Sequence, residues 1–317
     1  MNSYKYISLF LILLSVNHVL FAQEKLNPSP YTIETTYQKL KKDHPFIKPV
    51  QELVSEEIKA KEDVTYRKVN SVTLKADVYR PSKKRRGGYP AVILVHGGGW
   101  ASGSKENERV MAQHLAQNGY VGVSVAYRLS EVAKYPAAVQ DIKASIRWLR
   151  KNARKYNIDA DRIAILGASA GAQLATLIGV TSNDPMFSEG GTKYSDEVQA
   201  IVNVDGIVSF IHPEAEEGKY AAYWLGGGKE TNFITWKVAS PLEYVDENTP
   251  PTLFINSAQP RFHAGRDDMI AILDANNIYS EVHTIPESPH SFWLMHPWFE
   301  VTLNFTLDFL DKTLGER

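Results

Sequence analysis

The residues best suited to chemistry lie in a Gly-x-Ser-x-Gly segment centred on Ser169. A short buried strand is expected at residues 162–166, before this segment, and an alanine-rich stretch typical of a helix follows it. A serine on a sharp strand-to-helix turn exposes its hydroxyl above the sheet, where a base can reach it. Gly167 and Gly171 flank it because a Cβ in so tight a turn would collide with neighbouring backbone. A glycine-serine loop without chemistry is the alternative, but the pattern favours a nucleophilic serine.

A second motif, His-Gly-Gly-Gly-Trp at residues 96–100, supplies candidate hydrogen-bond donors for the same chemistry. It follows the apolar residues 91–95, which are typical of a central parallel strand. Glycine N–H groups can point into a pocket because no side chain fills the space. With the N–H of Ala170, Gly98 and Gly99 are therefore predicted to form an oxyanion hole. A phosphate-binding loop is the alternative, but no Lys-Ser/Thr pair follows the glycines.

The general base is predicted to be His290, which follows the last expected strand at residues 280–285. The order of glycine loop, serine and histidine along the chain is that of hydrolases with a serine turn of this kind. The alternatives are His263, His283 and His296. His283 lies inside the expected strand and His296 begins the final helix, so both are interpreted as structural.

The acid that orients the histidine has two candidates. The loop after the expected strand at residues 252–256 is its usual place, and the first carboxylate there is Asp267, in the first turn of a helix. Asp205 ends the preceding strand, and a carboxylate at the carboxyl end of a strand points towards the site. A carboxylate in a first helical turn is often only a partner of the helix dipole. Asp205 is therefore favoured over Asp267, and both stay candidates.

The expected elements alternate between strands and helices from residue 91 onwards, which predicts an α/β fold with a doubly wound, mostly parallel sheet. An antiparallel hairpin is expected at residues 64–79. A small cap insertion is expected at residues 207–248, where the strand–helix rhythm breaks. The predicted domains are a linker with one or two surface helices at residues 23–60 and a catalytic domain at residues 61–317.

The first 22 residues have the layout of a secretory signal peptide. Lys5 precedes an apolar run, and the small residue Ala22 marks the expected cleavage site. No second apolar span follows, so we expect no stable membrane insertion. The chain has no cysteine, which excludes disulfides and a cysteine nucleophile and favours a bacterial periplasm or medium. We expect a secreted or periplasmic protein.

Charge gives no sign of a nucleic-acid partner, because 35 basic residues nearly balance 36 acidic ones. Neither metal nor cofactor is expected. The oligomeric state is not predicted.

Together these motifs resemble the α/β-hydrolase superfamily, and most of all its bacterial carboxylesterases with a His-Gly-Gly-Gly-Trp loop, such as feruloyl, acetyl-xylan and pectin esterases. Residues 135–141, 147–153 and 161–163 also look like that group, and the resemblance covers residues 64–314. It implies Ser169 as nucleophile, His290 as base, and the donors named above. This sequence departs from the family's pattern in one respect, because the loop directly after residues 252–256 lacks the acid of the triad.

Four further residues are candidates for substrate binding. Arg261 and His263 stand where the acid is missing, and they could bind the carboxylate of an acidic sugar. A packed salt-bridge cluster is the alternative. Trp100 and Trp293, with Trp224, could stack on sugar rings, although packing within the cap would explain them as well.

The predicted function is that of a secreted serine carboxylesterase that removes acetyl, methyl or feruloyl groups from plant or algal polysaccharide, such as pectin or xylan. A small-molecule esterase, an amidase or peptidase of the same fold, and an inactive hydrolase-fold binding protein are the alternatives.

Overall fold

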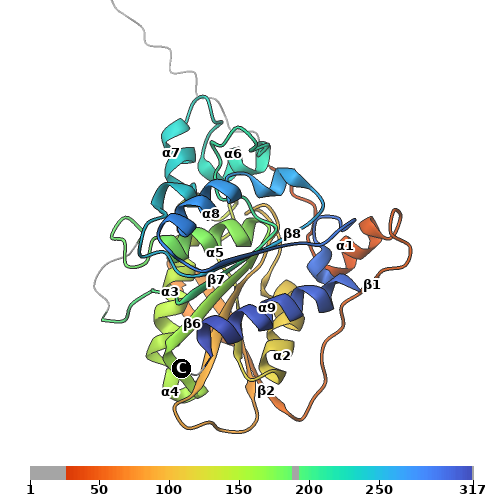
Figure 1. Ribbon diagram of the computed structural model, residues 1–317, viewed down its shortest axis with the longest axis vertical. Helices are drawn as coiled ribbons and strands as arrows, with labels where there is room; N and C mark the ends of the chain where they lie inside the picture. The colour runs from red at the N-terminus through yellow and green to blue at the C-terminus, as the bar shows by residue number, and fades with distance from the viewer. Residues whose placement is uncertain (1–25, 188–192, 316–317) are drawn as a thin grey trace, which may run out of the picture.

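The computed structural model describes residues 26–187 and 193–315 (Figure 1). The predicted signal peptide, residues 1–22, lies outside the described residues. Within the described ranges, no helix is both long and apolar enough to span a membrane.

An eight-stranded sheet forms the centre of the molecule, in the order β2-β3-β5-β4-β6-β7-β8-β9. β2 and β3 form the antiparallel hairpin, β3 pairs with β5 antiparallel, and the remaining neighbours are parallel. The predicted mostly parallel sheet with an N-terminal hairpin is confirmed. The strand bounds are β2 Ile58–Val69, β3 Val72–Pro81, β4 Tyr89–Val95, β5 Val121–Val125, β6 Ile158–Ala168, β7 Ala200–Val204, β8 Thr252–Asn256 and β9 Ser280–Thr284.

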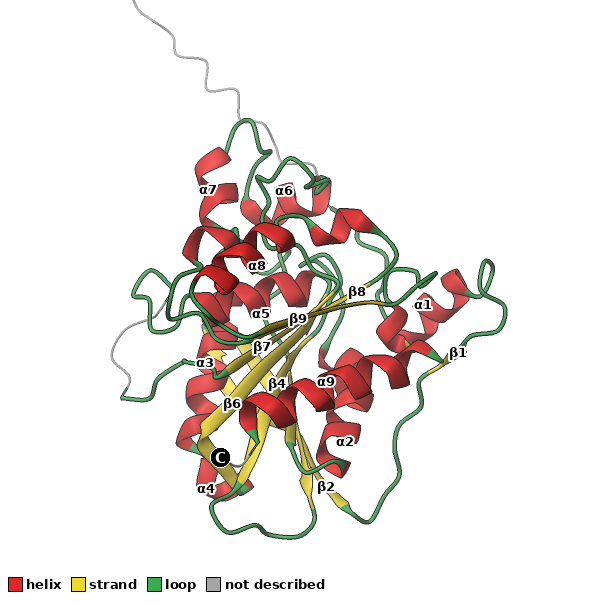
Figure 2. Cartoon of the chain, viewed as in Figure 1, coloured by secondary structure: helices red, strands yellow, loops and turns green. Residues whose placement is uncertain are grey.

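Helices cover both faces of this sheet (Figure 2). Alternate side chains of β4 point to opposite faces, so Ile93 packs in one apolar cluster and Leu94 in the other. α3 (Ala137–Lys151) and α5 (Ala170–Val180) cover the first face, whereas α2 (Arg109–Gln117) and α9 (Trp298–Leu314) cover the second. The apolar run of β4 is thereby buried on both sides, as a central parallel strand requires.

The remaining helices are short. Residues 137–156 form two helices, because Asn152 between α3 and α4 leaves the helical conformation (φ −102°, ψ 13°). The bounds are α1 Ile33–Leu40, α4 Ala153–Tyr156, α6 Lys219–Leu225, α7 Phe233–Val238 and α8 Arg266–Ala275, with 3₁₀ turns at Lys105–Glu108, Pro241–Tyr244, Pro260–His263 and Phe292–Leu294.

The described part of the N-terminal segment, residues 26–60, contains the helix α1. β1 (Lys48–Pro49) follows it and pairs antiparallel with β10 (Met295–His296). β2 already begins at Ile58, so the expected boundary at residue 61 falls inside a strand. Tyr37 and Leu40 pack against the same apolar cluster as α9. This segment is therefore part of the packed domain.

Residues 207–248 contain α6 and α7, which lie together beyond one end of the sheet (Figure 1). Their tryptophans are internal, because Trp224 and Trp236 both pack against Phe210. Tyr220 of α6 lines the same two pockets as Ser169, which places this insertion over the serine turn.

Candidate active site

Ser169 occupies a strained turn between β6 and α5. Its backbone has φ 55° and ψ −122°, a conformation that L-residues rarely adopt. A Cβ at Gly167 would lie 2.0 Å from the carbonyl oxygen of Gly171, so the turn tolerates only glycine there. The tight strand–turn–helix expected from the sequence is present.

His290 connects Ser169 to Asp205. Its Nε2 lies 2.8 Å from the Oγ of Ser169, and its Nδ1 lies 2.6 Å from Oδ2 of Asp205. Asp205 follows β7, and its backbone N–H donates to Ile255 of β8, which fixes the carboxylate at the end of the sheet. The three side chains form a continuous chain of the kind that transfers a proton from a serine hydroxyl to an imidazole.

The surroundings of Asp205 keep it ionised. Burial raises its pKa, but contacts with His263 and His290 and the N–H that Ser257 donates to Oδ1 at 2.8 Å lower it to about 2. A carboxylate that stays ionised favours the His290 tautomer with a proton on Nδ1, which leaves Nε2 free to accept the proton of Ser169.

Asp267, the other candidate acid, does not meet His290. Its side chain is 82% exposed and pairs with Arg266 at 2.8 Å in the first turn of α8. That hydrogen bond lowers the pKa of Asp267. The helix points the carboxylate towards solvent, so the structure brings Asp205 and not Asp267 to the histidine.

Aromatic rings hold the imidazole of His290. The ring of Phe262 stacks on it at a centroid distance of 3.6 Å, and Trp293 meets it edge-on at 5.2 Å. Trp293 is 3% exposed and lines neither pocket described below, which contradicts its expected role in sugar stacking. The indole serves as packing beneath the histidine.

His263 also differs from expectation. Its Nε2 points at Oδ1 of Asp205, 3.6 Å away, and the residue does not line the catalytic pockets. It is therefore a second histidine beside the buried carboxylate and not a substrate-binding residue. Arg261, in contrast, is exposed, with its guanidinium 4.2 Å above the Phe262 ring, and it lines the smaller pocket.

The glycine loop turns back on itself next to Ser169. The N–H groups of Ala101 and Ser102 both donate to the carbonyl of Gly98, whose φ of +114° suits glycine alone. Ala170 is the first residue of α5, so its N–H has no acceptor within the helix. Gly99 and Ala170 line the same pocket as Ser169, which is the arrangement that oxyanion donors need.

His96 supports this loop from below. Its Nδ1 lies 2.8 Å from the carbonyl oxygen of Gly97, and its ring stacks on Tyr127 at 4.3 Å. Burial lowers the pKa of His96 to about 4, so the ring is neutral at physiological pH. No cluster of three or more metal-ligating side chains occurs in residues 26–187 or 193–315.

Two pockets meet at Ser169 and His290. The larger pocket, of about 440 Å³, is lined by the glycine loop and the N-terminal segment, and the smaller one, of about 170 Å³, by the cap and the end of β7. Tyr220 lines both. Trp100 borders the smaller pocket but is 3% exposed and stacks on Trp224 at 5.0 Å, so these two rings form core and not a sugar platform.

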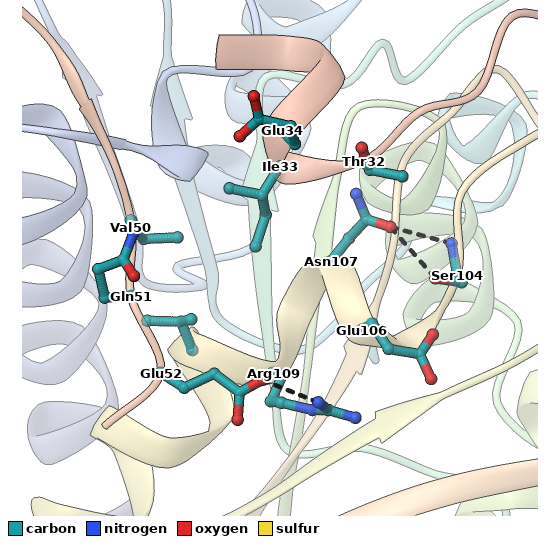
Figure 3. Close-up of a pocket in the computed structure, with 11 residues that line it drawn as sticks. Thr32, Ile33, Glu34, Val50, Gln51, Glu52, Ser104, Glu106, Asn107 and Arg109 are labelled. Carbon is teal, nitrogen blue, oxygen red and sulfur yellow. Dashed lines mark hydrogen bonds and ion pairs between the residues drawn. The ribbon is translucent and has the colours of Figure 1, made fainter. Parts of the chain in front are cut away.

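Sequence reasoning missed most of the pocket lining, including Tyr31, Glu217 and Tyr220. They come from the N-terminal segment and the cap, neither of which carries a motif that marks it. A separate cavity of about 310 Å³ lies beside the start of α1 and contains none of the candidate catalytic residues (Figure 3). There Arg109 pairs with Glu52.

The sheet order and the serine turn define an α/β-hydrolase fold, and comparison with solved structures agrees. A thermophilic esterase from Thermogutta terrifontis superposes with a TM-score of 0.68 at 22% identity, covering 82% of this chain and 94% of that one. A bifunctional GH43-CE protein of Bacteroides eggerthii gives a TM-score of 0.68 at 27% identity, covering 81% and 38%. The predicted fold class is confirmed.

The chain belongs to the BD-FAE family, whose model matches residues 76–280. Among curated relatives, the probable carboxylic ester hydrolase LipM of Mycobacterium tuberculosis is 26% identical, covering 66% of this chain and 48% of LipM. Versiconal hemiacetal acetate esterase of Dothistroma septosporum is 27% identical, covering 85% and 84%. The chain spans about half the length of LipM and of two other mycobacterial esterases, LipC and LipQ.

Proposed function

We propose that this protein is a serine carboxylic ester hydrolase. The observation that carries the proposal is the chain of hydrogen-bonding distances from Ser169 through His290 to Asp205, 2.8 and 2.6 Å long. The esterase relatives and the family membership support the same reaction class.

In the proposed reaction the Oγ of Ser169 attacks the ester carbonyl while Nε2 of His290 takes its proton. N–H groups of Gly98, Gly99 and Ala170 stabilise the oxyanion. His290 then protonates the leaving alcohol, which departs and leaves an acyl-enzyme. Water attacks the acyl-enzyme, gives its proton to His290, and releases the acid with the regenerated serine.

The proposed substrates are acetyl, methyl or feruloyl esters on plant or algal polysaccharide. Support comes from the carbohydrate esterase part named in the Bacteroides eggerthii neighbour. We also propose that the protein is exported, with residues 1–22 as a cleaved signal peptide. The apolar run behind Lys5 supports this proposal.

The test is release of acetate, methanol and ferulate from pectin and acetylated xylan, for wild type beside Ser169→Ala. Release of one product, reduced about 10,000-fold or more by the substitution, is expected. Cleavage of short p-nitrophenyl esters without any release from polysaccharide would instead indicate a small-molecule esterase. An unchanged rate in Ser169→Ala would contradict the serine mechanism.

Arg261 is proposed to favour acidic sugars by pairing with a uronate of the sugar chain that stays outside the smaller pocket, because its exposed guanidinium stands at the edge of that pocket. Arg261→Ala is expected to raise the KM for a uronate ester severalfold more than the KM for a neutral sugar ester. Equal KM changes for the two substrates would contradict this role. Lys237→Ala, an exposed cation of α7, is the matched control.

A further inference from the structure

One wall of the larger pocket comes from residues 29–40, which precede the region that matches the family model. Ser29, Thr36 and Lys39 face the space that Ser169 and His290 border from the other side. More than 120 residues separate α1 from the serine turn in the sequence, so this wall is a feature of the tertiary fold.

Specific contacts hold this wall beside the catalytic histidine. The Tyr31 hydroxyl donates to Oγ of Ser291 at 3.2 Å, next to His290 in the chain. The carbonyl of Tyr31 accepts from Nδ2 of Asn107 at 3.3 Å. β1 pairs with β10 just beyond Ser291. The segment is thus attached to the loop that carries the base, and a group bound against it lies within reach of the reacting atoms.

The lining of the larger pocket suits a polyhydroxylated ligand. The hydroxyl of Ser29 can donate and accept, and that of Ser102, which donates to the carbonyl of Gly98, can still accept. Lys39 adds an ammonium donor, and Tyr220 offers an aromatic ring. None of the described residues that line this pocket carries a carboxylate. Its volume of about 440 Å³ lies within the usual range for small-molecule sites, whereas the smaller pocket of about 170 Å³ lies below it.

We propose that residues 29–40 form the binding site for the alcohol half of the ester, a sugar residue of a carbohydrate ester, and that the smaller pocket takes a short acyl group. This inference rests on the proposed esterase function, and among the proposed substrates it selects the acetyl esters. In a methyl ester the sugar is the acyl half, and a feruloyl group is not short. It assigns the larger group of the substrate to the larger, hydroxyl-lined pocket, and it makes α1 a determinant of specificity.

The test narrows the mouth of the larger pocket without touching the catalytic residues. Lys39→Trp and Ser29→Trp replace exposed rim residues, and Gln38→Trp places the same side chain on α1 outside the pocket as the matched control. Each variant is assayed with acetylated xylo-oligosaccharide and with methyl acetate, whose alcohol is too small to reach the rim. Melting temperatures verify that the variants fold.

In both rim variants the KM for the oligosaccharide is expected to rise about tenfold, whereas kcat/KM for methyl acetate stays within about twofold of wild type. The control variant Gln38→Trp is expected to stay within about twofold of wild type with both substrates. Unchanged oligosaccharide kinetics in the rim variants would overturn the inference. So would a changed preference between methyl acetate and methyl butyrate, because the pocket would then hold the acyl half.

A binding measurement separates this inference from the proposed reaction. Calorimetry with the deacetylated xylo-oligosaccharide is expected to give binding to Ser169→Ala that weakens about tenfold when Lys39→Trp is added. If the oligosaccharide binds and Lys39→Trp weakens that binding, but the wild-type protein hydrolyses no ester, only the esterase proposal is contradicted. Hydrolysis of methyl acetate together with binding that Lys39→Trp leaves unchanged would contradict the sugar site alone.

Discussion

At the scale of single residues, the site depends on which carboxylate reaches His290. Asp205 and Asp267 both follow neighbouring strands, and both keep lowered pKa values. Only Asp205 is buried and bonded to the imidazole, whereas Asp267 pairs with Arg266 at the surface. Ionisation alone therefore does not identify the acid, and the distance to the histidine does.

Asp205→Asn is expected to lower kcat by about 1,000- to 10,000-fold, because an amide at this position favours the wrong tautomer of His290. Asp267→Asn, the matched control, is expected to stay within about twofold of wild type. Steady-state kinetics on a p-nitrophenyl ester measure both. A collapse of kcat in Asp267→Asn with an active Asp205→Asn would reverse the assignment.

A second buried carboxyl, Glu108, lies outside the catalytic chain. It is 2% exposed, its Oε1 makes no hydrogen bond within the described residues, and the phenols of Tyr31 and Tyr127, whose pKa values are raised by burial, lie near it. Burial raises the pKa of Glu108 from 4.5 to about 8. Between these two values the folded state keeps a proton that the unfolded state has lost, so the free energy of unfolding falls as pH rises.

Glu108→Gln removes this titration. Relative to wild type, the variant is expected to gain stability progressively from pH 5 to pH 8 and then to level off. Urea unfolding at pH 5, 6.5 and 8 measures the difference, and Glu56→Gln on the surface serves as control. A stability difference that is independent of pH would show that Glu108 does not titrate in this window.

At the scale of elements, buried ion pairs join the helices to the sheet. The fully buried ammonium of Lys143 on α3 lies 3.0 Å from Oδ1 of Asp196, which precedes β7, and Arg147 bonds to the other oxygen. The N–H of Asn183 also donates to Asp196, at 2.7 Å. These contacts fix the entry to β7, the strand that ends at Asp205.

Asp196→Ala is expected to cost about 3–5 kcal/mol of unfolding free energy, because it leaves Lys143 buried without its carboxylate. Chemical denaturation of the purified variant measures the loss. Glu197 is the exposed neighbour of Asp196, and Glu197→Ala is expected to change the free energy of unfolding by less than about 0.5 kcal/mol. Equal stabilities of the two variants would contradict a structural role for this ion pair.

At the scale of the whole molecule, the chain combines a near-zero net charge with a strongly apolar start. Charge does not attract it to nucleic acid or to an anionic surface. The export proposed above rests on residues 1–22, which lie outside the described residues.

The exported protein is expected to begin at Gln23, because Ala22 is the small residue at the end of the apolar run. Mass spectrometry of the mature N-terminus, after expression in a bacterium with an outer membrane, tests this. Deletion of residues 2–22 is expected to keep the protein in the cytoplasm and active. An intact N-terminus on periplasmic protein would contradict the cleavage.

The local features around Ser169 could be predicted from neighbouring residues in the chain. The apolar run, the glycines around Ser169 and the alanine-rich helix belong to one continuous stretch, and backbone sterics within a few residues dictate its turn. The glycine loop and His290 could also be predicted locally, because each follows an expected strand in the sequence. These elements and their order along the chain could be predicted without any knowledge of tertiary contacts.

The contacts between those elements could not be predicted in this way, because they depend on how the chain packs. Asp205 and His290 are 85 residues apart, and their contact depends on the order of β7 and β8 in the sheet. The N-terminal wall depends on the docking of Tyr31 against Ser291, 260 residues away. The burial of Trp100 and Trp293 depends likewise on what packs over them. Composition and spacing describe neighbours along the chain, whereas burial and pairing are properties of the packed molecule.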